Sequence, residues 1–154
     1  MIPRILALLL LSLVVACAPR SGTERLSAGS TVDIASAGTQ LSVQRAGNGI
    51  IRPLIHSPEL QAAAEAQAEA LGGGARMGQL RAGGSDLPDR LRRAGYSACA
   101  SAENVATGTS DIRTSIASWM DNAGDRANIL NPQVTQFGFA GLGDTWVLVL
   151  ARPC

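Results

Sequence analysis

The chain has 154 residues, enough for one domain with an apolar core. Aromatic residues make up only 3%, so Ala, Leu, Ile and Val must build most of that core. Its 13 basic residues, all of them Arg, nearly balance 12 acidic residues, and this near-neutral charge excludes the basic footprint of a nucleic-acid-binding protein.

The N-terminus has the pattern of an export signal that ends at a cysteine. Arg4 precedes an apolar run over residues 5–16, which is shorter than the roughly 20 residues of a membrane span. The run closes with Val-Val-Ala-Cys at Cys17 and resembles a bacterial lipobox, in which cleavage before the Cys leaves a thiol that carries diacylglycerol. The pattern predicts a signal peptide over residues 1–16 and a lipoprotein with acyl chains, such as palmitate, on Cys17. An ordinary secretory signal with an incidental cysteine is the alternative.

Lipidation at Cys17 would place the protein in the cell envelope, and Ala18, where Asp would favour the inner membrane, favours the outer membrane or its periplasmic face. The residues that follow, through 31, are rich in Ser, Gly, Ala, Pro and Arg without periodicity, which is typical of a flexible tether. The globular domain is therefore expected over residues 32–154. Loss of Arg4 with the signal leaves 12 Arg against 12 acids.

The other two cysteines, Cys99 and Cys154, form an even remainder in an oxidising compartment. We expect a disulfide between them, which would fix the C-terminus. Two free buried thiols are the alternative.

Helix signals dominate the first two thirds of the domain. A weak first helix is expected over residues 32–48. Ser57 can cap a second helix, with Pro58 at its first position and Glu59 in its first turn, and the glycines at 72–74 end it. A short helix follows over residues 87–94.

Three arginines on this short helix form the only dense basic spot of the chain, at Arg90, Arg92 and Arg93. Asp86 lies four residues before Arg90, and Asp89 lies four before Arg93. This spacing predicts a solvated helix face with internal ion pairs.

A helix, a turn and a second short helix are expected between residues 112 and 132. Apolar residues through Trp119 recur at helical spacing, so the first helix buries one face. Gly124 is expected to break it with a positive φ, and Asp125 to cap a new turn over residues 126–130 that Pro132 stops.

The end of the chain has the pattern of a β-hairpin. Residues 134–140 and 145–152 alternate or run apolar, with the Gly-rich turn 141–144 between them. The continuous apolar run at 146–150 is typical of a central strand that is covered on both faces. The fold class expected is α+β, an α-β-α sandwich with a small antiparallel sheet flanked by helices.

Four ordered segments resemble a known family. They are the end of the first helix around Arg45, Pro-Glu-Leu-Gln-Ala-Ala-Ala from Pro58, Ala-Glu-Asn-Val-Ala around Glu103, and Gly-Asp-Arg-Ala-Asn-Ile-Leu-Asn-Pro from Gly124. Together they are similar to the bacterial branch of the CAP superfamily, which includes cysteine-rich secretory proteins and SCP-like domains. The resemblance covers roughly residues 39–152 and implies the CAP-type α-β-α sandwich.

The family's cleft usually presents two histidines and one or two glutamates. By this resemblance the histidine positions are Gln79 and Asp125, the surviving cleft glutamate is Glu103, and the second glutamate position is Asn122. Glu103 could instead be structural, holding backbone amides or Arg126.

Without an imidazole these four positions favour a plain polar groove over a Zn²⁺ site, and we expect neither a metal nor a cofactor. The only histidine, His56, lies outside the cleft pattern, and we expect no functional role for it. Glu103 with Asp125 could form an acid/base pair as in glycosidases, although capping accounts more simply for Asp125.

These observations predict a membrane-anchored, non-catalytic binding module with a degenerate cleft. Its expected partners are the membrane, through the lipid anchor, and an envelope ligand that is a lipid, peptidoglycan or a protein, with no nucleic acid and a monomeric domain. Two alternatives remain open, a hydrolase using Glu103 and Asp125, with or without a metal, and a structural envelope protein whose groove has no ligand.

Overall fold

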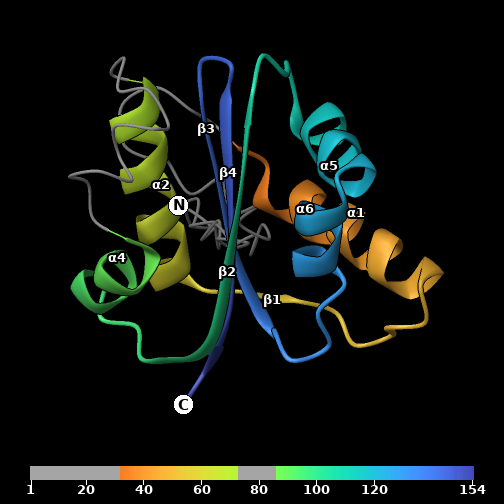
Figure 1. The fold of residues 1–154 in the computed structure, drawn as a ribbon, viewed down its shortest axis with the longest axis horizontal. Coiled ribbons are helices and arrows are strands. Elements are labelled where there is room, and N and C mark those ends of the chain that lie inside the picture. The colour runs from red at the N-terminus through yellow and green to blue at the C-terminus, as the bar shows by residue number, and fades with distance from the viewer. Residues whose placement is uncertain (1–31, 73–85) are drawn as a thin grey trace, which may run out of the picture.

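The fold of the chain was obtained as a computed structural model, which describes residues 32–72 and 86–154. Three layers are visible in Figure 1, with a sheet between two groups of helices. The elements in chain order are α1 (Ile34–Gly47), β1 (Ile55–His56), α2 (Pro58–Gly72), α4 (Leu87–Arg93), β2 (Ala98–Thr107), α5 (Ile112–Asp121), α6 (Ala123–Ile129), β3 (Gln136–Leu142) and β4 (Thr145–Pro153). The predicted α-β-α sandwich is confirmed.

The sheet is mixed, whereas the sequence pattern predicted an antiparallel one. Its four strands run in the order β1-β3-β4-β2, with β4 antiparallel to both β3 and β2. The exception is β1, which pairs with β3 in parallel, with Ile55 opposite Gln136. This short strand forms where the chain crosses from the α1 layer to the α2 layer, so the sequence of two residues carries no strand pattern of its own.

Strand β2 is the second element that the sequence did not indicate. It contains Ala, Ser, Glu and Asn, which are not strong strand formers. It is a strand because it pairs along its length with the apolar strand β4, for example Asn104 with Leu148. Tertiary pairing here outweighs local propensity.

The terminal hairpin and both core faces agree with the prediction. Strands β3 and β4 meet at a two-residue turn, Gly143-Asp144, where Gly143 has a φ of +62°. Along β4, Leu148 and Leu150 pack into the core under α1, α5 and α6, while Val147, Val149 and Ala151 pack under α2 and α4. The alternation shows why the strand is apolar throughout: each of its faces meets a helical layer.

Helix α2 approaches the sheet very closely at a glycine of β3. A Cβ atom at Gly138 would lie 2.2 Å from the carbonyl carbon of Leu60, so only glycine fits between the strand and the helix. The predicted start of α2 is confirmed, because Ser57 Oγ accepts from Leu60 N at 3.3 Å.

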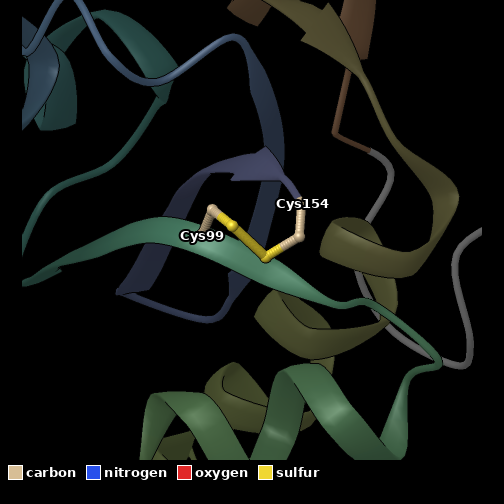
Figure 2. Close-up of a disulfide and its surroundings, with 2 residues drawn as sticks. All are labelled: Cys99 and Cys154. Carbon is tan, nitrogen blue, oxygen red and sulfur yellow. A yellow bond between two sulfur atoms is a disulfide. The ribbon is translucent and has the colours of Figure 1, made fainter.

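The disulfide between Cys99 and Cys154 is present, with Cα atoms 4.8 Å apart (Figure 2). Cys99 lies where the register of β2 against β4 shifts, between Ala98 and Ala100. Cys154 N also donates to the carbonyl of Ser97 at 3.0 Å, so a covalent bond and a hydrogen bond together close this end of the sheet. The alternative of two free buried thiols is not realised, since both residues are exposed.

Among residues 32–72 and 86–154, no helix combines the length and apolar character needed to cross a bilayer. The predicted signal, Cys17 and the tether lie outside the described residues.

Candidate functional site

Polar side chains gather around the middle of β2, the edge strand of the sheet. They come from α4, β2 and α6, and we call them the β2 polar cluster: Arg90, Glu103, Asn104, Asp125 and Asn128. The cluster contains both carboxylates that the sequence placed at the family's cleft, Glu103 and Asp125.

Glu103 points toward the layer of α2 and α4, where it forms an ion pair with Arg90. Both side chains are removed from solvent, with 18% of the Glu103 side chain and 6% of the Arg90 side chain exposed. Burial raises the pKa of the Glu103 carboxyl above its ordinary value, and the Arg90 charge and hydrogen bond oppose that rise. The partner of Glu103 is therefore Arg90 on α4 and not Arg126, which lies exposed on α6.

The ion pair corrects the prediction for the arginine cluster of α4. Arg90 is buried and reaches across to β2 instead of pairing with Asp86 on a solvated face. Asp86 caps the helix by accepting from Asp89 N at 2.9 Å, and Asp89 pairs with Arg92. Arg90 pairs with a residue of another element, and not with one of its own helix, because position 90 of α4 faces the sheet, next to the buried Leu91.

On the opposite face of β2, two asparagines connect the strand to α6. Asn104 Nδ2 donates to the carbonyl of Asp125 at 3.0 Å, and Asn128 Nδ2 donates to Asn104 Oδ1 at 2.8 Å. Asn104 is only 1% exposed, so its amide needs these partners. Both asparagines stand inside the family-like segments, but only the fold reveals that they meet.

Asp125 does not cap the second short helix, contrary to the prediction. The helix begins at Ala123, and the cap is Asn122, whose Oδ1 accepts from Gly124 N at 2.9 Å and from Asp125 N at 3.1 Å. Gly124 lies inside this helix and is not among the described glycines with positive φ. The helix starts three residues earlier than expected because Asn122 is itself a good cap.

The carboxylate of Asp125 is half-buried in the first turn of α6, and burial raises its pKa. Within the described part of the chain it has no hydrogen-bond or salt-bridge partner. Glu103 and Asp125 therefore flank β2 from its two faces, and only Glu103 is neutralised by a cation. A negative charge in the first turn is favourable toward the helix dipole.

The structure describes only some of the remaining sequence-predicted positions. Asn122 is an exposed helix cap, and Gln79 and Cys17 lie outside the described residues. His56 contacts the edge of the Phe137 ring and lies 3.3 Å from Gln61 Oε1, which makes it part of the packing around β1. Over the described ranges, no group of three or more His, Cys, Asp or Glu side chains gathers where it could hold a metal ion.

Arg45 connects this region to the first helix. It is 1% exposed, and its Nη1 donates to the carbonyls of Ile129 at 2.7 Å and of Asn131 at 3.0 Å, where α6 ends. A cation at the C-terminal end of a helix satisfies carbonyls that have no partner within the helix. The family-like segments around Arg45 and around residues 124–132 are therefore in direct contact.

Comparison with known proteins identifies one family and several solved structures with the same fold. The model of the cysteine-rich secretory protein family, CAP, matches residues 45–145. No curated protein matches the chain.

Three bacterial structures share the fold. An extracellular protein of Bacillus anthracis that contains an SCP domain matches with a TM-score of 0.65 at 20% identity over 77% of this chain. An outer surface protein of Borrelia burgdorferi matches with a TM-score of 0.66 at 16% identity, over 79% of this chain and 93% of its own. A cysteine-rich secretory protein of Staphylococcus aureus has a TM-score of 0.58 at 21% identity over 76% of this chain. The match covers 39% of the Bacillus and of the Staphylococcus protein, so this chain spans well under half of either.

Proposed function

This chain belongs to the cysteine-rich secretory protein (CAP) family, and from that premise we propose that it is a lipid-anchored envelope protein whose CAP domain binds a ligand without catalysis. The envelope location is supported by the lipobox-like segment at Cys17 and by the extracellular or outer-surface origin of two structural neighbours. The disulfide between Cys99 and Cys154 suits an oxidising compartment.

The observation that carries the non-catalytic part is the ion pair between Glu103 and Arg90. A general base or nucleophile needs a carboxylate that is available to the reacting group. Here the carboxylate of Glu103 is held by a guanidinium, and the amides of Asn104 and Asn128 are bound to each other and to the backbone of α6. These polar groups stabilise the packing of α4 and α6 against β2, which suits a rigid wall for a bound ligand.

Binding and turnover assays of the purified native protein with the candidate envelope ligands test this function. We expect saturable binding of muropeptides, phospholipids or an envelope protein, with no product formed. A matched pair of variants separates the roles: Glu103→Gln keeps the shape of the side chain without the charge, and Asn122→Ala changes the same region without touching a carboxylate. Turnover by the native protein that Glu103→Gln removes and Asn122→Ala keeps would contradict the proposal.

A hydrolase remains the second candidate, and one observation favours it. Burial raises the pKa of both Glu103 and Asp125, and raised carboxyl pKa values are a property of general acids. In this candidate Glu103 would donate the proton, and Asp125, which lies toward the other face of β2, would have to act as the base or nucleophile around the edge of that strand. Its test is the same assay, with Asp125→Asn expected to remove the activity as well.

The lipid anchor has its own test. Mass spectrometry of the protein from its native membrane should find acyl chains on an N-terminal Cys17. A Cys17→Ser variant should remain unprocessed. An unmodified N-terminus downstream of Cys17 would remove the anchor from the proposal and leave a secreted binding protein.

A further inference from the structure

The outer side of α1 carries an open groove of about 520 Å³. Small residues of the helix, such as Gly38, Ser42 and Ala46, form part of it, and Val43 and Leu54 supply its larger apolar side chains. The core side of the same helix is occupied by the buried Ala37 and Leu41. In Figure 1, α1 lies at one lateral end of the molecule, away from α2 and α4.

Large apolar side chains are exposed along this end of the molecule. Val43 of the groove is 63% exposed, and Ile51 is 89% exposed. Ile51 lies in the loop that runs from the end of α1 to Leu54, so the loop connects two parts of the groove. Burial of apolar area releases about 25 cal/mol per Å², and exposed apolar side chains that adjoin an apolar groove, unlike single ones, favour a binding surface.

The same stretch of chain has no negative charge. Residues 34–58 contain no Asp or Glu, although the chain has 12 acids in total. Asp33, at the start of this stretch, is occupied as the cap of α1, where it accepts from Ser36 N at 3.0 Å. Arg52, next to Ile51, is exposed. An exposed apolar side chain beside an arginine, in a stretch of chain without acids, complements a bilayer with anionic headgroups.

The position of α1 in the chain puts this surface close to the proposed lipid anchor. Residues 17–31 separate Cys17 from Val32, the first described residue, and α1 begins two residues later. The proposed tether of this length would have a root-mean-square reach of roughly 20 Å. The helix that bears the groove is thus the first described element after the proposed anchor.

From these observations we infer that the face formed by the α1 groove, Ile51 and Arg52 docks onto an anionic phospholipid bilayer. The inference rests on the proposed anchor for its geometry and on the exposed residues for its chemistry. Docking of this face would hold the domain in one orientation on the membrane. The β2 polar cluster lies on other elements, α4, β2 and α6, and none of its residues is needed for the contact.

Photo-crosslinking in reconstituted vesicles tests the contact. The native lipidated protein is prepared with p-benzoylphenylalanine in place of Val43, or in place of Ala66 as the control, an exposed residue of α2 on the other side of the sheet. Vesicles of phosphatidylcholine with and without phosphatidylglycerol are compared. We expect lipid adducts mainly from position 43, and mainly when phosphatidylglycerol is present.

A charge variant measures the role of Arg52. Arg52→Gln should lower the yield of lipid adducts from position 43 by up to about fivefold, the effect of one cation near an anionic surface. Arg93→Gln removes the same charge from exposed α4 and should leave the yield unchanged. Equal yields for all variants would overturn the electrostatic part of the contact.

The outcomes separate the docking surface from the anchor. If an alkaline wash leaves the protein on the vesicles but position 43 gives no more lipid adduct than position 66, the docking proposal is wrong and the proposed anchor stands. If position 43 is crosslinked to lipid but the protein is washed off, the anchor is wrong and docking stands. Adducts from position 43 to a second copy or to another protein would identify a protein as the occupant and overturn the inference.

Discussion

The side-chain amide of Gln61 replaces a missing strand beside Phe139. Gln61 Oε1 accepts from Phe139 N at 3.0 Å, and Gln61 Nε2 donates to the Phe139 carbonyl at 3.0 Å. Strand β1 ends at His56, opposite Phe137, so the edge of β3 has no strand partner at Phe139. One glutamine on α2 therefore completes the hydrogen bonding of the sheet where β1 stops.

Replacement of Gln61 should destabilise the fold strongly. Gln61 is 4% exposed, so Gln61→Ala leaves the N–H and C=O of Phe139 buried without partners. Each buried group that loses its partner costs about 1–3 kcal/mol, and we expect a loss of ~3 kcal/mol in the free energy of unfolding. Urea denaturation measures it.

Gln61→Glu is the matched control for geometry, because it keeps the acceptor and removes the donor. We expect it to be as destabilising at neutral pH, since a buried carboxylate would face the Phe139 carbonyl. Exposed Ala66 on the same helix serves as the neutral site, and Ala66→Gln should change stability by less than about 0.5 kcal/mol. A Gln61→Ala loss of that same small size would contradict the proposed role.

The cap of α6 can be assigned by a pair of substitutions. Asn122→Ala should destabilise the protein by about 1 kcal/mol, because Gly124 N and Asp125 N lose their acceptor. Asp125→Asn should have a smaller effect, since its side chain does not cap the helix. Thermal unfolding of both variants decides between them, and the reverse order would restore Asp125 as the cap.

Glu103 should make stability depend on pH in a defined direction. Its folded pKa lies above the ordinary value of 4.5, so the folded protein binds the proton more tightly than the unfolded chain. The contribution of this group is fully present below about pH 4.5 and is lost as the pH rises through the higher folded pKa. Urea unfolding at a series of pH values should therefore show that the free energy of unfolding of Glu103→Gln increases relative to that of the native protein as the pH rises over that window.

Two controls belong to this experiment. Glu69→Gln changes an exposed glutamate of α2 and should leave the pH profile unchanged. Arg90→Met should raise the pKa of Glu103 further, because it removes the positive charge that opposes the effect of burial, and should destabilise the protein at neutral pH by ~3 kcal/mol. Carbon-detected NMR titration follows the carboxyl directly, and a lowered pKa in Arg90→Met would refute the account.

Removal of the disulfide should weaken the end of the sheet. Cys99 and Cys154 are separated by 55 positions, and closing such a loop stabilises a fold by about 4 kcal/mol as an upper value on the chain-entropy estimate. The double variant Cys99→Ser/Cys154→Ser should unfold at lower urea concentration but keep its secondary structure, because Cys154 N still donates to Ser97. Non-reducing peptide mapping of the native protein should recover the linked pair.

Local sequence determined the starts of α2 and α5 and the terminal hairpin. Asp111 and Ser57 cap their helices through side chains that reach N–H groups only three residues away, so the signal and its partner lie in one short segment. The buried face of α5, with Ile116 and Trp119, follows from helical spacing alone. The apolar run of β4 likewise indicated a strand covered on both sides.

Tertiary structure alone decided the candidate site and the order of the sheet. Asn104 meets Asn128 across 24 positions and Gln61 meets Phe139 across 78, and no local pattern encodes such contacts. Strand β2 forms because it pairs with β4. Arg90 is buried against Glu103, and not exposed on a solvated helix face, because α4 packs onto β2. Capping and periodicity act within a few residues and can be read from the sequence, whereas the partners of buried polar groups depend on which elements the hydrophobic core brings together.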